Sequence, residues 1–298
     1  MKIKLGIAPI AWSNDDMPEL GGDTPIEKCL EEASQAGFTG IELGGKFPRN
    51  PGITNFLINK FQLKMPGGWY GSNLRKRSVL DEWSAMQDHL NLLKMVDGDI
   101  FIFADVSGSI QGEAKKPLSL RPKLELSEWK EYCNKINEIS NRLADIGIPM
   151  SYHEHMGTII QTEDDVNKFM ENTNDNTFLL YDTGHLFFAQ ADYKSILKKY
   201  IKRINHIHCK DIRKDILANS IQNDLSFRES FLEGVFTVPG DGCIDYKPLF
   251  DILFENKYQK WLIIEAEQDP KKANPFEYAK KGYNYLSKTA KDSGFIIK

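Results

Sequence analysis

Short strand-like runs alternate with helix-like segments along almost the whole chain. The strand-like runs are Leu5–Pro9, Thr39–Leu43, Gln62–Met65, Ile100–Ala104, Met150–His155, Phe178–Asp182, Ile204–Cys209 and Trp261–Glu265. The segments between them carry apolar residues at helical spacing, as in Pro25–Gln35. Eight strand–helix units in 298 residues predict an α/β fold, a single (β/α)8 TIM barrel. The main alternative is a doubly wound open sheet, but no G-x-G-x-x-G motif follows the first run.

We find no linker and no break in composition, so we expect one domain that spans residues 1–298. The other predicted helices are Asn55–Lys60, Asp81–Met95, Ser127–Asp145, Glu163–Glu171, Asp192–Tyr200, one around Tyr246–Leu253, and Pro275–Lys288. Two long segments, Asp105–Leu126 and Lys210–Gly242, are predicted to be loops. Because both follow strands, we expect them to cover the end of the barrel that carries active sites.

Five of the six histidines lie at the ends of three successive strand-like runs. These residues are His153, His155, His185, His206 and His208. Side chains alternate faces along a strand, so His153 and His155 share a face, as do His206 and His208. Asp182 adds a carboxylate at the end of the middle run. Imidazole and carboxylate suit divalent zinc, manganese, cobalt or iron. Unrelated polar strand ends would not give such regular spacing, so we predict one shared metal site.

The last strand-like run adds two carboxylates. Glu265 and Glu267 share a face and can join the site from the closing side of the barrel. The alternative is a salt-bridged pair at the surface. Their position beside an apolar run disfavours it, because unpaired buried carboxylates are costly.

Composition narrows the class of partner. The net charge is −4 without a long basic run, which argues against nucleic acid and anionic membranes. The four cysteines are scattered without a C-x-x-C pair, as in reduced cytosolic proteins. The first residues lack the apolar core of a signal peptide, and there is no run of 18 apolar residues. We therefore expect a cytoplasmic protein that acts on a small molecule, and the sequence leaves assembly into a homo-oligomer open.

The set of strand-end residues resembles the xylose-isomerase-like barrel superfamily of sugar isomerases, epimerases and endonuclease relatives. The resemblance implies one divalent metal with ligands from strands five to eight. Asp182 in Asp182-Thr-Gly-His185, His208 in His206-Ile-His208, and Glu265 match three of them. Most members carry a Glu ligand on strand five, and the alignment of Met156-Gly-Thr158 puts His153 there. Glu154, His155 and Gln161 stay open as alternatives, although Glu154 is expected to face the opposite side of its strand.

Within that superfamily, the chain is similar to the inosose dehydratases. The stretches that carry this are Trp12-Ser-Asn-Asp-Asp, Gly22-Asp-Thr-Pro, Gly40-Ile-Glu-Leu-Gly, Lys46-Phe-Pro, Tyr152-His-x-His-Met-Gly-Thr158, Asp182-Thr-Gly-His, His206-x-His-x-Lys-Asp211, Phe236-Thr-Val-Pro-Gly-Asp-Gly-Cys-Ile-Asp245 and Glu265-Ala-Glu-Gln-Asp-Pro270. The resemblance implies metal-dependent dehydration of 2-keto-myo-inositol to a trihydroxycyclohexane-1,2-dione in inositol catabolism, with Mn²⁺ or Co²⁺ favoured. A sugar or polyol-ketone isomerase or epimerase on the same barrel is the alternative. A barrel that only binds a polyol is disfavoured by the complete ligand set, and an abasic-site endonuclease by the acidic balance.

Such a dehydration needs a base for the α-proton and an acid for the departing β-hydroxyl. Lys210, His155, His185 and Glu267 are the available groups. Lys210 could act as the base with a lowered pKa, or steady the enolate when charged. A second set of residues is suited to bind the hydroxyls of a polyol. It comprises Asn14, Glu42, Lys46, Trp69 and His206, with Trp69 expected to follow the third strand.

Overall fold

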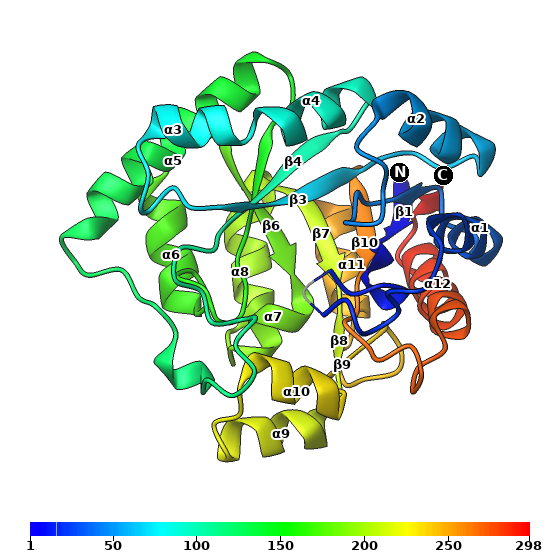
Figure 1. Ribbon diagram of the computed structural model, residues 1–298. Helices are drawn as coiled ribbons and strands as arrows, with labels where there is room; N and C mark the ends of the chain where they lie inside the picture. Colours follow the sequence, from blue (N-terminus) through cyan, green and yellow to red (C-terminus); the bar gives the residue numbers. More distant parts are fainter. Residues whose placement is uncertain (16) are drawn as a thin grey trace.

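The computed structural model describes residues 1–15 and 17–298. Within these residues, eight parallel strands form a barrel (Figure 1). They are β1 (Lys2–Ile7), β2 (Gly40–Ile41), β3 (Gly67–Ser72), β4 (Ile100–Asp105), β5 (Met150–His153), β6 (Thr177–Asp182), β7 (Ile204–Cys209) and β10 (Trp261–Ile264). Each pairs with the next from β3 to β7, β7 pairs with β10, and β10 with β1. The barrel closes because β2 pairs with β1 and Leu43 forms a parallel bridge to Gly68 of β3. The predicted (β/α)8 fold is therefore confirmed.

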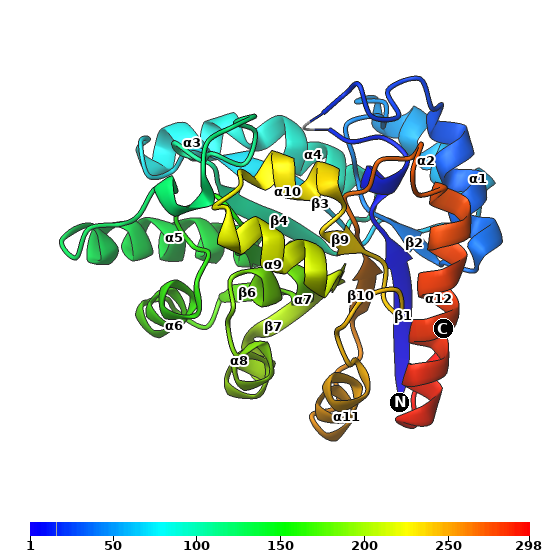
Figure 2. The same ribbon diagram turned by 90° about the horizontal axis from the view of Figure 1, so that it is seen from below.

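Helices surround the strands on the outside of the barrel (Figures 1 and 2). They are α1 (Ile26–Ala36), α2 (Pro51–Lys60), α3 (Val79–Ala85), α4 (Gln87–Met95), α5 (Glu128–Asp145), α6 (Glu163–Asn172), α7 (Thr183–Phe188), α8 (Tyr193–Tyr200), α9 (Lys214–Gln222), α10 (Phe227–Glu233), α11 (Lys247–Glu255) and α12 (Pro275–Asp292), with short 3-10 turns at Pro9–Ala11, Leu118–Leu120 and Ile201–Arg203. The closing helix α12 lies beside α1, and the short strand β11 (Ile296–Ile297) pairs with β1, so the two ends of the chain are neighbours. None of the helices in the described part of the chain is long and apolar enough to cross a membrane.

Local signals set several of these boundaries. Asn50 and Ser78 cap α2 and α3 by accepting hydrogen bonds from the backbone, and Thr162 forms a capping box with Asp165 at the start of α6. Gly37 ends α1 in a left-handed conformation with a φ of 105°, which glycine adopts at little cost. Ser127, which directly precedes α5, makes no such side-chain bond.

Three predictions of secondary structure were wrong: the third strand, the helix Asp81–Met95 and the loop Lys210–Gly242. The third strand is Gly67–Ser72 and not Gln62–Met65, so Trp69 lies within the strand instead of after it. Three of its six residues are glycines, which hide its strand character in the sequence. The predicted helix Asp81–Met95 is two helices that meet at Met86.

The predicted loop Lys210–Gly242 is largely ordered secondary structure. It holds α9, α10 and an antiparallel ribbon of β8 (Asp211–Ile212) with β9 (Phe236–Thr237).

Strand residues alternate between two environments. Outward side chains such as Ile207 and Tyr181 pack with the helices in the main core. Inward side chains such as Ile102, Leu180 and Ile263 form small apolar clusters inside the barrel. At the carboxyl ends of the strands, the inward positions become polar, and this layer carries the candidate site.

Candidate metal centre and active site

Four buried side chains from four neighbouring strands converge at the carboxyl end of the barrel. His153 ends β5, Asp182 ends β6, His208 lies near the end of β7, and Glu265 follows β10. One ligand atom from each lies within 4.8 Å of all the others. These are the residues that sequence reasoning selected as metal ligands, and their inward strand positions bring them together.

The two imidazoles of this group are held in different orientations. The Nδ1–H of His153 donates to the carbonyl oxygen of Glu154, which leaves Nε2 facing Asp182 Oδ2 at 3.8 Å. His208 instead turns Nε2 toward Glu42 and Nδ1 toward the group. His208 Nδ1 lies 2.7 Å from Glu265 Oε2 and 3.5 Å from Asp182 Oδ2. Both imidazoles therefore present one ring nitrogen to the same point.

The donor set fits a divalent cation. Asp182 Oδ1 accepts hydrogen bonds from the backbone N–H groups of Gly184 and His185, at 2.8 and 2.9 Å. Asp182 Oδ2 and His208 Nδ1 are buried, and among the described residues neither makes a hydrogen bond with favourable angles, although both face charged neighbours. Buried polar atoms are rarely left unpaired, and two imidazoles with two carboxylates form a suitable four-ligand set.

The other strand-five candidates lie elsewhere. Glu154 faces away from the group, as expected, and its Oε1 accepts a hydrogen bond from the Asp182 N–H at 3.1 Å. Burial, with the nearby Asp182 carboxylate, raises the pKa of Glu154 well above its usual value. Gln161 Oε1 accepts from the Gly157 N–H at 2.7 Å, within a loop.

Lys210 is completely buried and surrounded by acceptors. Its ammonium lies 2.9 Å from Glu265 Oε1, 2.8 Å from Glu267 Oε1 and 3.0 Å from His185 Nε2. Burial by itself would lower the pKa of Lys210, but Asp182, Glu265 and Glu267 outweigh it and raise that pKa. The surroundings thus favour the charged form of Lys210 and disfavour its role as a neutral base. Asp211 does not pair with it but accepts four backbone hydrogen bonds instead.

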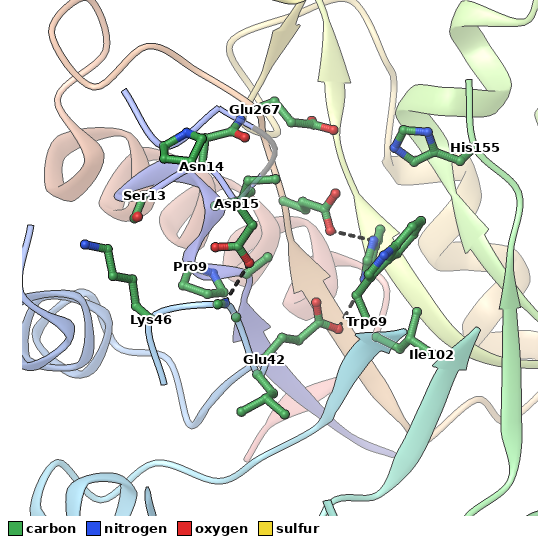
Figure 3. Close-up of a pocket in the computed structure, with 18 of the residues that line it drawn as sticks. Pro9, Ser13, Asn14, Asp15, Glu42, Lys46, Trp69, Ile102, His155 and Glu267 are labelled. Carbon is green, nitrogen blue, oxygen red and sulfur yellow. Dashed lines mark hydrogen bonds and ion pairs between the residues drawn. The ribbon is translucent and has the colours of Figure 1, made fainter. Parts of the chain in front are cut away.

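A cavity of about 530 Å³ opens onto the group from the loop side of the barrel (Figure 3). His208 and Glu265 reach its wall, and so do the catalytic candidates His155 and Glu267. Lys210 and His185 lie behind that wall, both almost completely buried. Of the four catalytic candidates, the structure thus brings His155 and Glu267 to the cavity.

The two groups at the wall have shifted pKa values. Burial raises the pKa of Glu267 to about 7, with the neighbouring Lys210 opposing and Glu265 adding to the shift. Burial and the positive charge of Lys210 lower the pKa of His155 to about 4. Near neutral pH, His155 is therefore an unprotonated imidazole, while Glu267 can hold or release a proton.

Four of the five predicted substrate-binding residues line the cavity: Asn14, Glu42, Lys46 and Trp69. In Figure 3, Glu42 and Glu267 stand on opposite sides, with Lys46 across from Trp69 and His155. The Trp69 ring meets the rings of His153 and His155 edge-on, at centroid distances of 5.3 and 5.6 Å. His206 does not reach the cavity, because it lies behind Glu42 and binds it. The structure therefore does not support the prediction that His206 binds substrate.

The family model described as xylose isomerase-like TIM barrel matches residues 30–289. The chain belongs to this family. The resemblance drawn from the sequence is confirmed, and with it the assignment to a family of enzymes.

Relatives that align over nearly the full length show to which named members of the xylose isomerase-like family the chain is similar. The chain is 42% identical over 297 residues to the rhizopine catabolism protein MocC of Rhizobium meliloti. This alignment covers 100% of this chain and 91% of the relative. It is 40% identical over 291 residues to the inosose dehydratase of Clostridium tetani, covering 97% of this chain and 98% of the relative. The predicted similarity to inosose dehydratases, which are hydro-lyases, is confirmed.

Solved structures support the fold. The protein described as the probable 3-DHS dehydratase AsbF from Bacillus anthracis aligns over 96% of this chain and 99% of its own with a TM-score of 0.72 at 14% identity. An L-ribulose 3-epimerase aligns over 98% of this chain and 95% of its own with a TM-score of 0.70 at 16% identity. At these identities, the likeness shows the xylose isomerase-like fold alone.

Sequence reasoning missed several residues at the cavity. Gln111 in the β4–α5 segment, Arg49 after β2, and His89 of α4 also line it. His89 belongs to none of the motifs, and its Nε2–H donates to the Gly68 carbonyl oxygen at 3.2 Å. No local pattern marks these positions, because tertiary packing alone brings a helix and a loop to the strand ends.

The two segments expected to cover the site both reach its edge and bind each other. Ser226, which caps α10, donates through Oγ to the Ala114 carbonyl oxygen at 2.9 Å. The Phe227 ring follows at a centroid distance of 5.1 Å from His155. Helix α10 also reaches the β1–α1 segment through the ion pair of Arg228 with Glu19. Segments from three different connections are thus joined beside the cavity.

Proposed function

We propose that this protein is an inosose dehydratase that removes water from 2-keto-myo-inositol, with a bound divalent metal ion. The observation that carries the proposal is the full-length similarity, near 40% identity, to several proteins of that name. The convergence of His153, Asp182, His208 and Glu265 beside a polyol-sized cavity supports it. The proposed product is a trihydroxycyclohexane-1,2-dione.

The proposed ligands are His153 through Nε2, His208 through Nδ1, and the carboxylates of Asp182 and Glu265. A divalent cation held there would polarise the ketone oxygen of the substrate and favour loss of the neighbouring proton. The two neutral imidazoles and two carboxylates balance its charge. Mn²⁺ or Co²⁺ is our first choice, on the family resemblance.

The chain's own groups divide the proton transfers. The α C–H bond breaks, its proton goes to a base, and the electron pair forms a C=C bond while the β-hydroxyl leaves. The enol that results then tautomerises, moving its hydroxyl proton to carbon, to give the 1,2-dione. His155, neutral and at the cavity wall, suits the base. Glu267, with a pKa raised to about 7, suits the acid that protonates the departing hydroxyl, so that water is released. Lys210 and His185 lie behind them, and Lys210 holds Glu265 and Glu267 in place.

A second candidate, favoured by the 42% identity to the rhizopine catabolism protein, is a step in the breakdown of rhizopine. The sugar or polyol-ketone isomerase or epimerase, expected as the alternative from sequence, begins with the same loss of an α-proton. Product identity separates these possibilities.

The test of function is a product assay. Metal-loaded protein is incubated with 2-keto-myo-inositol, and products are followed by NMR and by the absorbance of a conjugated dione. We expect the dione to form. Recovery of an isomeric ketone with no dione would support the isomerase or epimerase instead. Turnover of rhizopine in a parallel incubation, with inosose untouched, would favour the second candidate.

The test of the metal site is the metal content of Asp182→Ala, His208→Ala and Glu265→Ala. We expect each purified variant to lose most of its bound metal. Asp164→Ala is the matched control, because Asp164 is an exposed carboxylate that pairs with Lys168 on α6. Full metal occupancy in all three site variants would contradict the assignment.

A further inference from the structure

One carboxylate oxygen of Glu42 lies against two imidazoles. Glu42 Oε1 is 2.6 Å from His206 Nε2 and 3.1 Å from His208 Nε2. All three side chains are buried, and their ligand-type atoms lie within 4.8 Å of one another. Glu42 follows β2 and the histidines lie on β7, so the contact crosses the inside of the barrel. The Oε1 atom of Glu42 is thus already engaged with the two histidines and is not free for a substrate hydroxyl.

The geometry restricts which nitrogen of His208 carries the proton. A carboxylate oxygen accepts hydrogen bonds, so each Nε2 that contacts Glu42 carries a hydrogen. Burial by itself would lower the pKa of His208, but Glu265 and Glu42 outweigh it and raise that pKa. His208 therefore gives up the Nδ1 proton that faces Glu265 only when a cation binds, and the neutral imidazole then keeps its one N–H at Nε2 and offers the lone pair of Nδ1. That Nδ1 is the atom that lies near Asp182 Oδ2 and Glu265 Oε2. The free lone pair therefore points at the proposed cation.

We propose that Glu42 is a positioning residue for the metal ligand His208. It holds the imidazole in the Nε2–H form and in the rotation that turns Nδ1 toward the other three ligands. The inference rests on the proposed metal site and is independent of which substrate is used. Carboxylates that bind the second nitrogen of a ligating histidine commonly tune metal affinity in this way.

His153 makes a useful contrast. Its Nδ1–H is held by the carbonyl oxygen of Glu154, so Nε2 faces the group. The two histidines thus bind through different nitrogens. A main-chain acceptor positions His153 and a side chain positions His208, so substitution can remove the support of His208 alone.

His206 has a place in this arrangement. It is fully buried inside the barrel, and its Nε2 makes the shorter of the two contacts with Glu42. It therefore anchors the carboxylate on the side away from His208. This explains an inward-facing histidine that neither reaches the cavity nor belongs to the four-ligand group.

The test measures metal affinity and tautomer directly. Metal-depleted wild type, Glu42→Ala and Glu42→Gln are titrated with Mn²⁺ or Co²⁺ by calorimetry. We expect Glu42→Ala to bind about 10- to 100-fold more weakly. Glu42→Gln keeps an oxygen that accepts an N–H, so it should recover most of the affinity. Asp15→Asn is the control, because Asp15 is a cavity carboxylate that accepts from the Gly45 N–H and touches neither histidine.

The second readout is the histidine tautomer. In ¹⁵N-labelled protein loaded with diamagnetic Zn²⁺, two-bond ¹H–¹⁵N correlations should show His208 as the Nε2–H form in wild type and as a mixture in Glu42→Ala. An affinity of Glu42→Ala within twofold of wild type, or an unchanged tautomer, would overturn the inference. If Glu42→Ala does not fold, Glu42→Asp, which draws the carboxylate back by one methylene, replaces it. If wild type binds metal and dehydrates inosose, and Glu42→Ala binds the metal equally well, the proposed function stands and the inference is refuted.

Discussion

Gly184 lies directly against the buried side chain of Lys210. A β-carbon at position 184 would fall 2.5 Å from Cγ and 2.7 Å from Cδ of Lys210. The glycine of the Asp182-Thr-Gly-His185 motif therefore makes room for the lysine stem that carries the ammonium to Glu265 and Glu267. Through this contact, a residue with no functional group controls the position of a charged one.

Gly184→Ala should displace Lys210 while the ligand Asp182 stays in place. We expect kcat to fall by about 10- to 100-fold with little change in KM, because the ammonium supports groups that act mainly in the transition state. Lys210→Met, which removes the ammonium, should keep metal and fold and lose at least as much activity. Gly112→Ala is the control, since a β-carbon there would meet nothing within 4 Å. A Gly184→Ala enzyme as active as Gly112→Ala would contradict the packing argument.

The roles of His155 and Glu267 can be separated by following the two proton transfers independently. Glu267→Gln should lose dehydration by about 100-fold or more yet still exchange the substrate α-proton with deuterated buffer. His155→Gln should lose both reactions. NMR of the substrate in deuterated buffer gives the exchange rate, and dione absorbance gives the dehydration rate. Unchanged exchange in His155→Gln would return the role of base to Lys210, His185 or Glu267.

The joined segments beside the cavity should become harder to cut when a ligand binds. Lys115 is exposed and adjoins Ala114, which binds Ser226 at the start of α10. We expect trypsin to cleave there more slowly with a bound inositol analogue than with glycerol at equal concentration, because closing a cover excludes water and protease alike. Equal rates of cleavage would count against closure.

Acid should destabilise the protein through His89. Burial lowers the pKa of His89 from 6.5 to about 4, so the unfolded chain binds its proton more readily. The stability that neutral His89 gives is complete above about pH 6.5 and is lost as the pH falls toward 4. Relative to His89→Gln, wild type should lose roughly 2 kcal/mol of unfolding free energy between pH 7 and 4.5. Urea denaturation at both pH values measures this, and parallel losses in the two proteins would exclude the effect.

The sequence alone predicts the barrel and the shared faces of its polar strand ends for the same reason. Strand periodicity places every second residue inside, so the strand-end histidines and carboxylates could be assigned to shared faces. The family resemblance then selected His153, Asp182, His208 and Glu265 among them. The same reasoning fails where the local signal is weak. The glycines of Gly67–Ser72 hide the third strand, and neither strand nor helix period marks Met86 as the junction of α3 and α4.

Contacts across the barrel lie beyond sequence reasoning for a different reason. Glu42 was selected as a group for substrate hydroxyls because it follows a strand. Its hydrogen bonds to His206 and His208 depend on the spacing of strands that are neither sequential nor paired, β2 and β7. His89 likewise reaches the cavity from a helix, through packing that no motif encodes.

The central claim is that a metal ion held by His153, Asp182, His208 and Glu265 enables dehydration. The most direct measurement is a titration of Mn²⁺ or Co²⁺ into metal-depleted protein, with dione formation from 2-keto-myo-inositol as the readout. Wild type should be inactive without metal and reach full rate near one equivalent, whereas Asp182→Ala should stay inactive there. A metal-depleted wild type that forms the dione at full rate, or an Asp182→Ala variant restored by one equivalent, would contradict the account.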